Sequence, residues 1–493
     1  MKEIKYLPIK IVTLIVFLFA LNIIYKKYYF SNDVDKHSPI LLSIQQAVSD
    51  SAQIVYLSES SNTTYHDLDT DKRAISEMIQ DYYPTIKVHT IHKEATQANH
   101  HLQMLKSIKN PNNINTVIVT FNLRSFGSGW IYSGLETSLQ KSLVLIKSYP
   151  PLVNRFFLNF KNYPVWDKNY CDSKIRNSWS QARIYDHPKY DSINTINKWL
   201  SEIDKHQLDS LRELTKHYVK NYGFNLSLDS DNPRLKDYDE IISLCKANNW
   251  KLILNLMAEN LDQAQHLVGT PLVELFQSNV SYLKSRYTQD HVIIVDNLAA
   301  VKDDDFIDRS WPTEHYKENG RKAIAASVAS SLKSIYSTGF VQPDTITKLT
   351  TKYFEGAEMK AGLSINPTVT REKSYTGKSS SKTGNGNDFS VGFNIPIKQL
   401  PDSVKKLIVD FYIFMDDNNT EAKLVFETNG TDPYKFYDSY KVIYITKEIN
   451  KWTKLHYEYT LPELFNKSDF IKVYIWNTSK TNVYVDDLNL NFE

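Results

Sequence analysis

The sequence predicts an α/β domain with a three-layer parallel sheet, followed by an all-β sandwich of the jelly-roll type, behind an apolar N-terminal segment. Short apolar runs alternate with amphipathic stretches up to about residue 335, as in parallel sheets covered by helices on both faces. Residues 345–493 instead show alternating apolar and polar positions separated by turn-rich stretches, which is typical of antiparallel sandwiches. The length of 493 residues also exceeds that of one ordinary domain.

The N-terminal segment, residues 1–33, is predicted to be a membrane anchor followed by a short polar linker. Residues 11–25 carry no charge, and roughly 20 residues can cross a bilayer if Lys10 and Lys26 extend toward the headgroups. A cleaved signal peptide is the alternative, although no small-x-small cleavage site follows. We expect the bulk of the chain to lie outside the cytoplasm, in a periplasm or at the cell surface, while lysines on both sides leave the orientation open.

The predicted α/β domain covers residues 34–340. Its expected strands are residues 53–57, 116–121, 250–256 and 291–296. Its expected helices are residues 70–82, 98–108, 238–248 and 273–286. Reacting groups in such folds gather at the carboxyl ends of the strands.

The strand pattern stops between residues 150 and 228, which predicts a helical insertion. This segment is rich in aromatic side chains: Phe156, Phe157, Phe160, Tyr163, Trp166, Tyr170 and Trp179. They either pack the core of the insertion or form part of a wall over the active site, where Trp166 is the candidate substrate contact.

Charge and cysteine content exclude several classes of protein. A net charge of +2 provides no basic surface for nucleic acid. The two cysteines, Cys171 and Cys245, form neither a disulfide framework nor a Cys-rich metal site, and are either free thiols or one bridge. The four histidines between residues 89 and 101 lack a zinc-binding spacing, so we predict no metal and no cofactor.

The strongest chemical signal is a serine at the end of a predicted strand. Residues 53–57 run directly into Ser58, Glu59 and Ser60, which places the hydroxyl of Ser60 at the carboxyl end of a strand, where it is exposed at the end of the sheet. A serine hydroxyl is a weak nucleophile and needs a base within hydrogen-bond distance. His315 lies in a loop just before a helix near the end of the same domain and is the candidate base.

These segments together resemble the sequence blocks of SGNH/GDSL hydrolases. His315 lies five residues before Gly320, as the histidine does in the last block of that family, and the order Ser60, Asn122, His315 also matches. The resemblance implies that Ser60 is the nucleophile, His315 the base and Asn122 an oxyanion donor worth about 3 to 4 kcal/mol. An asparagine that caps a strand end is the alternative for Asn122. Arg124 is a candidate contact for an anionic or polar substrate.

The chain departs from this family at three positions. Residues 58–60 read Ser-Glu-Ser where the family has Gly-Asp-Ser. No glycine lies between residues 89 and 105, so Ala95 is the nearest substitute for the glycine whose amide completes the oxyanion hole. The family's aspartate, three residues before the histidine, is Pro312 here.

The missing aspartate leaves two expectations for the group that orients His315. Asp308 is the possible acid if its loop folds back onto the imidazole. Because Pro312 stiffens the approach to the histidine, we favour a Ser-His dyad oriented by a backbone carbonyl. In that case Asp308→Asn changes turnover by less than about tenfold, unlike the loss of the carboxylate in a triad.

The resemblance implies an extracytoplasmic esterase or O-acyltransferase that acts on acylated cell-surface polysaccharide. It is similar to the D-alanyl transfer proteins of teichoic acid synthesis and to polysaccharide O-acetyltransferases, which implies a membrane-bound acyl-donor protein as a partner. Hydrolysis and transfer share one acyl-enzyme intermediate, so the sequence does not distinguish them. The alternative is a catalytically weak or inactive SGNH-derived scaffold that binds glycans during polysaccharide assembly.

The predicted sandwich has expected strands at residues 404–414, 422–426, 440–445, 470–476 and 482–488. Residues 378–393 and 484–490 are similar to the jelly rolls of carbohydrate-binding modules, which stack sugars on aromatic rings. The candidate rings are Tyr434, Phe436, Tyr437, Tyr440, Trp452 and Trp476, of which Trp452 and Trp476 are the preferred contacts. A structural role is the alternative for these rings. Asp486 and Asp487 are either solvated or part of a calcium site.

Overall fold

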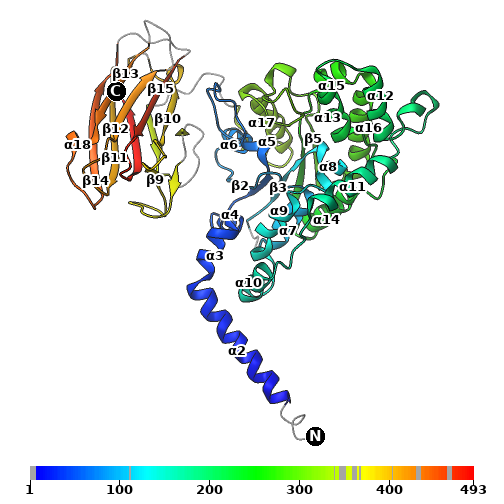
Figure 1. Cartoon of the computed structure of the whole chain (residues 1–493), viewed down its shortest axis with the longest axis horizontal. Helices are drawn as coiled ribbons and strands as arrows, with labels where there is room; N and C mark the ends of the chain where they lie inside the picture. Colours follow the sequence, from blue (N-terminus) through cyan, green and yellow to red (C-terminus); the bar gives the residue numbers. More distant parts are fainter. Residues whose placement is uncertain are drawn as a thin grey trace. The chain divides into compact units, whose positions relative to one another are not determined.

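The computed structural model describes residues 7–109, 113–337, 339–342, 351–357, 364–365, 368–401, 403–428, 435–462 and 469–493. The chain divides into two compact units (Figure 1). The first contains residues 1–66 and 74–341, and the second contains residues 67–73 and 342–493. The grouping of residues 67–73 with the second unit was not predicted from the sequence.

The first unit is built on a five-stranded parallel sheet with the order β2-β1-β3-β4-β5. Its strands are β1 (Ile54–Ser58), β2 (Val88–His92), β3 (Thr116–Phe121), β4 (Lys251–Leu256) and β5 (Val292–Asp296). The predicted parallel sheet is confirmed, but the edge strand β2 was missed. In β2 only Ile91 is fully buried, so the apolar run that marks a central strand is absent.

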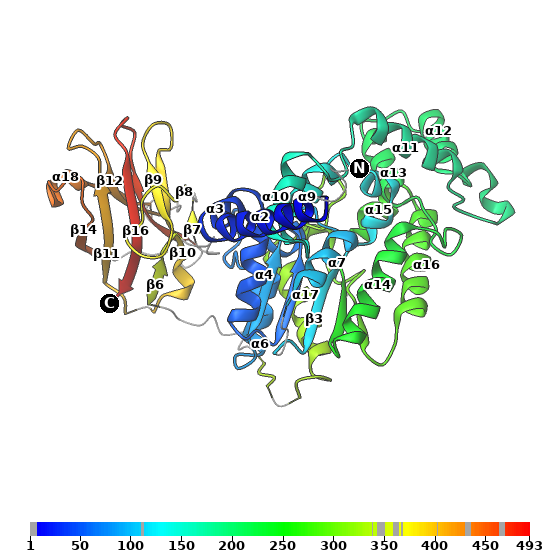
Figure 2. The ribbon, with the colours of Figure 1, turned by 90° about the horizontal axis from the view of Figure 1, so that it is seen from below.

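Helices cover both faces of this sheet because successive side chains of each strand point to opposite sides. On one face, Val55 and Leu57 share a core with helices α7 (Ala98–Ser107), α14 (Pro233–Ala247) and α16 (Thr270–Tyr287). On the other face, Ile54 and Tyr56 share a core with α6 (Ile75–Tyr82) and α17 (Glu318–Leu332). Figure 2 shows these helices around the strands.

Only helical elements lie between β3 and α14, in agreement with the predicted insertion. They include α8 (Ser128–Ile131), α9 (Glu136–Ser142), α10 (Pro151–Asn159), α11 (Lys168–Gln181), α12 (Ile196–His206) and α13 (Arg212–Tyr222). The buried rings Trp199, Tyr218 and Tyr222 belong to the same core as α14 and α16. The insertion is therefore packed onto the sheet domain rather than hanging from it.

From residue 7, where the description of the chain begins, three helices precede the sheet: α2 (Leu7–Tyr28), α3 (Phe30–His37) and α4 (Pro39–Ser49). By length and composition, α2 is long and apolar enough to cross a membrane. Helix α4 packs against β2 and contributes Ile40, Leu41 and Ile44 to the core. The polar linker expected at residues 31–33 is instead helical and belongs to α3.

The second unit contains two antiparallel sheets with the orders β13-β12-β15-β10-β7 and β14-β11-β16-β9-β8, with β6 paired to β16. Its strands are β6 (Lys352–Glu355), β7 (Ser364–Ile365), β8 (Val369–Thr370), β9 (Ser380–Thr383), β10 (Phe389–Pro396), β11 (Lys406–Met415), β12 (Lys423–Thr428), β13 (Tyr437–Lys441), β14 (Thr453–Thr460), β15 (Phe470–Trp476) and β16 (Val483–Phe492). Inward-facing residues of both sheets share one core, so the predicted β-sandwich is confirmed.

The strand expected at residues 440–445 is wrong. Strand β13 ends at Lys441, and the apolar residues that follow form the short helix α18 (Val442–Ile445). Val442 is fully buried and its amide bonds to the carbonyl of Ala422. Burial of this one side chain at the sheet edge outweighs the strand preference of the run.

Candidate active site

The candidate site lies at the carboxyl ends of the two central strands, β1 and β3. Leu57 and Val119 are paired in register, and three residues further along each strand lie Ser60 and Asn122. The strand order reverses at this point, because β2 flanks β1 on one side and β3 leads away on the other. In open α/β sheets, ligands bind at such a reversal.

Ser60 begins the short helix α5 (Ser60–Thr63), whose first turn is held by the residue before it. The Glu59 carboxylate accepts hydrogen bonds from the Ser61 amide at 3.2 Å and from the Ser61 hydroxyl. The buried amide of Asn62 donates to Ser58 Oγ at 3.3 Å and to Ser76 Oγ at 3.1 Å. The turn that presents Ser60 is therefore fixed at both ends by buried polar groups.

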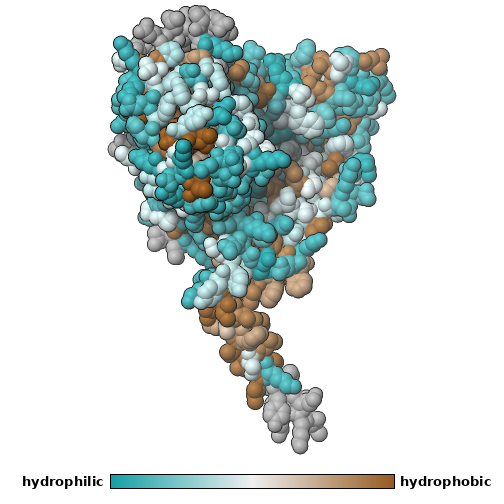
Figure 3. Space-filling model, turned by 60° about the vertical axis from the view of Figure 1, so that its left-hand side comes forward, coloured by the Kyte–Doolittle hydropathy of each residue, from teal (hydrophilic) through white to brown (hydrophobic). Residues whose placement is uncertain are grey.

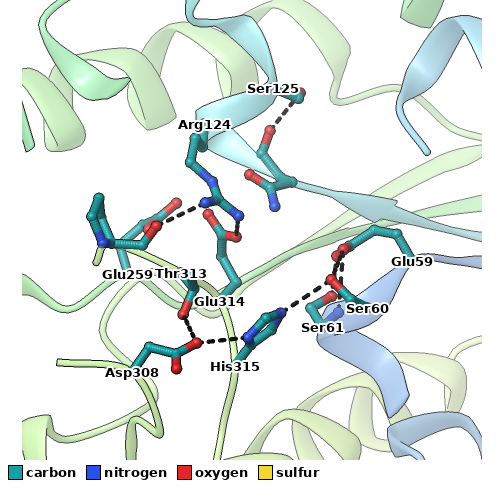
Figure 4. Close-up of polar contacts among 12 residues, drawn as sticks. Glu59, Ser60, Ser61, Arg124, Ser125, Glu259, Asp308, Thr313, Glu314 and His315 are labelled. Atoms are coloured by element: carbon teal, nitrogen blue, oxygen red, sulfur yellow. Dashed lines mark hydrogen bonds and ion pairs between the residues drawn. The ribbon is translucent and has the colours of Figure 1, made fainter. Parts of the chain in front are cut away.

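His315 contacts Ser60 and Asp308 through its two ring nitrogens. Its Nε2 lies 3.1 Å from Ser60 Oγ and its Nδ1 lies 2.8 Å from Asp308 Oδ2. The Thr313 hydroxyl donates to the same Asp308 oxygen at 2.8 Å. Figure 4 shows the imidazole between the serine and the carboxylate.

The contact with Asp308 assigns the tautomer of His315. A carboxylate only accepts hydrogen bonds, so Nδ1 carries the proton and Nε2 presents its lone pair to Ser60. The Ser60 hydroxyl has one proton and two acceptors, since Glu59 Oε2 also lies 2.9 Å away. The arrangement can remove a proton from Ser60 whenever the hydroxyl turns from Glu59 to His315.

The expectation that a backbone carbonyl orients His315 is wrong. Residues 305–308 pair antiparallel with residues 315–317 through a bridge between Phe306 and Tyr316 and a bond from the Ile307 amide to the His315 carbonyl at 3.0 Å. This pairing brings Asp308 beside the imidazole although it precedes it by seven residues. Pro312 lies at the far end of the loop and does not prevent the fold-back.

Asn122 and Ala95 present nitrogen atoms without protein partners. No hydrogen bond within the described ranges involves the Asn122 side-chain nitrogen or the Ala95 backbone nitrogen, and the buried Asn122 Oδ1 is likewise without a partner there. Ala95 adopts φ +60, a conformation that favours glycine. Its loop is held at the end of β1 because the Lys93 amide donates to the Ser58 carbonyl at 3.1 Å.

Arg124 does not face a substrate, contrary to the prediction. It is buried, and its guanidinium donates to the Pro312 carbonyl at 2.7 Å and to the Glu314 carboxylate. The adjacent Glu314 attracts the guanidinium inward, so the arginine fixes the loop that carries His315. The role of Thr313 and Glu314 was missed, since neither residue has a distinctive sequence neighbourhood.

A second buried carboxylate, Glu259, belongs to the same cluster. The Tyr222 hydroxyl donates to Glu259 Oε2 at 2.6 Å and lies 3.2 Å from Glu314 Oε1. Burial and the nearby charge of Glu314 raise the pKa of Glu259 well above its usual range. Arg124 thus contacts Glu314 directly, beside the Glu259 carboxyl group, whose raised pKa favours its neutral form.

Trp166 lies in the insertion, between α10 and α11. Its ring is 6.2 Å from that of Tyr132 and 5.6 Å from that of Tyr170. Tyr132 lines a cavity of about 360 Å³ between α8, α11 and the start of α14, where the buried hydroxyl of Ser128 has no hydrogen-bond partner among the residues described. Ser60, His315 and Trp166 are not among the residues that line this cavity, so the predicted substrate contact of Trp166 stays a prediction.

The sandwich aromatics do not form one surface. Trp476 belongs to β15 in one sheet, whereas Trp452 immediately precedes β14 in the other. Trp452 packs near Tyr375 and Phe414, and Trp476 stacks with Phe389. The remaining candidates differ in placement: Phe436 and Tyr440 pack against the core, Tyr437 is exposed, and Tyr434 lies outside the described residues.

The Asp486 carboxylate accepts hydrogen bonds from backbone amides. Its Oδ2 accepts from the Tyr375 amide at 2.7 Å and from the Thr376 amide at 3.2 Å. Among the residues described, no group of three or more His, Cys, Asp or Glu side chains is placed to hold a metal ion. Cys171 and Cys245 are both buried free thiols, which resolves the alternative of a bridge.

Comparisons with known proteins give partial matches to solved structures alone. No protein-family model and no curated protein sequence matches the chain. One similar structure is the C-terminal family 22 carbohydrate-binding module of Clostridium thermocellum Xyn10B, with 14% identity over 31% of this chain and 96% of that chain and a TM-score of 0.23. Another is the CBM22-1 xylan-binding domain from Paenibacillus barcinonensis Xyn10C, with 17% identity over 25% and 78% of the two chains and a TM-score of 0.19. A family 16 carbohydrate-binding module matches at 14% identity over 25% and 82%, with a TM-score of 0.20.

These matches carry no argument about what the chain binds, because their TM-scores and identities are low. The sandwich fold of the second unit rests on its own two antiparallel sheets.

Proposed function

We propose that this chain is an extracytoplasmic SGNH-type esterase or O-acyltransferase that acts on acylated cell-surface polysaccharide. The observation that carries the proposal is the hydrogen-bonded chain of Ser60, His315 and Asp308. His315 Nε2 lies 3.1 Å from Ser60 Oγ, and His315 Nδ1 lies 2.8 Å from Asp308 Oδ2. Both distances fall in the range expected of a nucleophile, its base and the group that orients the base.

In the proposed reaction, Ser60 Oγ attacks the carbonyl carbon of an O-acyl group while its proton passes to His315 Nε2. The bond between the carbonyl carbon and the sugar oxygen then breaks, and Nε2 returns the proton to that oxygen. Water or a second sugar hydroxyl attacks the acyl-Ser60 intermediate with His315 again as base. Asp308 stabilises the imidazolium formed in each half-reaction.

Three N–H groups support the oxyanion of this reaction. The backbone amides of Ser60 and Ala95 and the side-chain amide of Asn122 have no partner among the described residues. The left-handed conformation of Ala95 supports its assignment to the position that a glycine holds in SGNH enzymes. Each well-placed donor is worth about 3 to 4 kcal/mol in the transition state.

The sandwich is proposed to hold the polysaccharide through the partly exposed rings of Tyr375 and Trp452, whose centroids lie 6.1 Å apart, and separately through Trp476 on the other sheet. The alternative of an inactive glycan-binding scaffold is motivated by the missing aspartate, the missing glycine of the second block and the appended sandwich. Asp308 supplies a carboxylate beside His315, which removes the first of these three reasons. Transfer, unlike hydrolysis, further requires an acyl donor outside the cytoplasm, which a membrane-bound partner would deliver.

The proposal is tested with a fluorophosphonate probe on the full chain in detergent. Wild type is expected to be labelled, Ser60→Ala to lose labelling, and Ser61→Ala, the neighbouring serine in the same helix, to retain it. Thermal unfolding of each variant checks that the fold is intact. Labelling that persists in Ser60→Ala, or wild type that never reacts with the probe or with p-nitrophenyl acetate, would overturn the proposal.

A further inference from the structure

Helix α10 of the insertion is fixed to the apolar helix α2. The backbone amide of Leu152, at the start of α10, donates to Asn22 Oδ1 at 3.0 Å. Arg155 Nε lies 3.0 Å from Asp33 Oδ2, and the Tyr25 hydroxyl donates to the same carboxylate oxygen at 2.7 Å. One hydrogen bond and direct packing thus hold α10 against the last turns of α2, and the ion pair with Asp33 fixes α10 to the following helix α3 (Figure 2).

The length of α2 indicates how deep in a bilayer its contact with α10 would lie. The candidate membrane span is Pro8–Tyr28, 21 residues, which at a rise of about 1.5 Å per residue measures roughly 32 Å. That length matches a hydrocarbon core of about 30 Å. Asn22 lies six residues before the end of the span, or about 9 Å along the axis. A bilayer crossed by the whole span would therefore reach the start of α10.

The outward face of α10 carries exposed aromatic rings, as is common for surfaces at the boundary between a bilayer and water. Asn154 and Leu158 are buried in the domain, while Phe156 and Phe160 point away from it and are 40% and 80% exposed. Tyr149, just before the helix, is also exposed. Large apolar rings facing water are unfavourable by about 25 cal/mol for each Å² of apolar surface, whereas aromatic rings are enriched where a bilayer meets water.

Basic side chains lie on both segments that carry this face. Lys26 and Lys27 are exposed at the end of α2, and Lys161 is exposed after α10. A lysine close to an anionic lipid surface contributes about 1 kcal/mol of binding. Figure 3 shows that the surface of α2 is mainly hydrophobic.

We propose that the lipid-facing surface of this chain includes α10, and that Tyr149, Phe156 and Phe160 rest in the headgroup layer of the bilayer that α2 crosses. The first unit would then be held at the membrane by two elements, which restricts its rotation about α2. The proposal rests on α2 as the span and does not depend on the proposed chemistry at Ser60.

The test measures the depth of spin labels on the full chain in vesicles of phosphatidylcholine and phosphatidylglycerol. Single cysteines replace Phe160, Leu208 or Phe17 in a background in which Cys171 and Cys245 are alanine. Leu208 is the matched control, since it is 83% exposed in the same unit and lies between α12 (Ile196–His206) and α13 (Arg212–Tyr222), whereas the helices packed against α2 are α3 and α10. Power saturation compares the accessibility of each label to oxygen, which partitions into lipid, and to a water-soluble nickel chelate.

We expect the ratio of oxygen to nickel accessibility at position 160 to exceed that at position 208 at least severalfold, and to lie between the values at 208 and 17. A second label at Phe156 repeats the measurement in case the first disturbs the surface. Equal, water-like ratios at 160, 156 and 208 with a lipid-like ratio at 17 would overturn the proposal and assign the face to a protein partner. Water-like ratios at 17 as well would overturn it by removing the span.

Discussion

Two carboxylates flank His315 in very different surroundings. The Asp308 side chain is 39% exposed and contacts the imidazole, whereas the Glu314 side chain is 1% exposed and contacts Arg124. Both belong to the same loop. Asp308 contacts the imidazole of His315, whereas Glu314 holds the loop in place through its ion pair with Arg124. The comparison teaches that an exposed carboxylate can tune a reacting group while a buried one fixes the backbone that carries it.

The largest expected effect is a loss of turnover when the exposed carboxylate, Asp308, is replaced. Asp308→Asn should lower the turnover of p-nitrophenyl acetate by about 10³ to 10⁴, because it removes the charge that stabilises the imidazolium and favours the wrong tautomer. Steady-state kinetics measure it. Asp304→Asn, at a 97% exposed side chain in the same segment, should leave turnover unchanged. A loss below tenfold in Asp308→Asn would restore the dyad expected from the sequence.

Replacement of the buried carboxylate, Glu314, should change the stability of the fold rather than the turnover. Glu314→Gln leaves the buried Arg124 without its ionised partner and should lower the free energy of unfolding by about 3 to 5 kcal/mol. Chemical denaturation measures this loss, and turnover per folded molecule should fall far less than in Asp308→Asn. Glu202→Gln, which breaks the surface pair with Lys205, should change stability little. A Glu314→Gln variant as stable as wild type would end the proposed division of roles.

The third prediction concerns the pH dependence of the same buried cluster. Because the folded protein raises the pKa of Glu259, its stabilising contribution is complete below the unfolded pKa of about 4.3 and is lost as pH rises toward the folded value. Glu259→Gln removes this loss. Its free energy of unfolding relative to wild type should therefore increase between pH 5 and pH 8, by up to about 1.4 kcal/mol per pH unit. Unfolding curves that keep a constant difference across this range would show that Glu259 stays ionised.

The smallest expected effect tests the backbone rather than a carboxylate. Ala95→Gly should raise the free energy of unfolding by up to about 1 kcal/mol, because φ +60 costs alanine more than glycine. Turnover should hold, since the backbone amide is kept. Ala326→Gly, inside helix α17, is the matched control and should lose about 1 kcal/mol. Destabilisation in both variants would mean that Ala95 is not strained.

The sequence predicted the fold class well because the signals are local. The central strands β1, β3 and β4 are apolar runs, and the residues at their ends, Ser60 and Asn122, follow directly from them. Edge strands such as β2 lack that signal since polar side chains are tolerated there. Residues 440–445 show the same limit, because tertiary burial of Val442 decided between strand and helix.

The candidate site was only half accessible from the sequence. Ser60 and His315 were predicted from their neighbourhoods, whereas the place of Asp308 depends on the pairing of residues 305–308 with 315–317, which no spacing rule encodes. Arg124 was expected to meet a substrate because it follows Asn122. Its actual partner, Glu314, is 190 residues away in the chain and becomes a neighbour only in the folded domain.

The bridge between Phe306 and Tyr316 closes the loop that carries His315 at its base. The positions of Asp308 and His315 are set at that base, while residues 309–311 at the tip are exposed. Lengthening a loop adds only about 0.6 kcal/mol of closure entropy for each doubling. Insertions between Arg309 and Ser310 should therefore be accommodated without moving the acid from the base, which makes this tip a suitable place to graft new recognition segments.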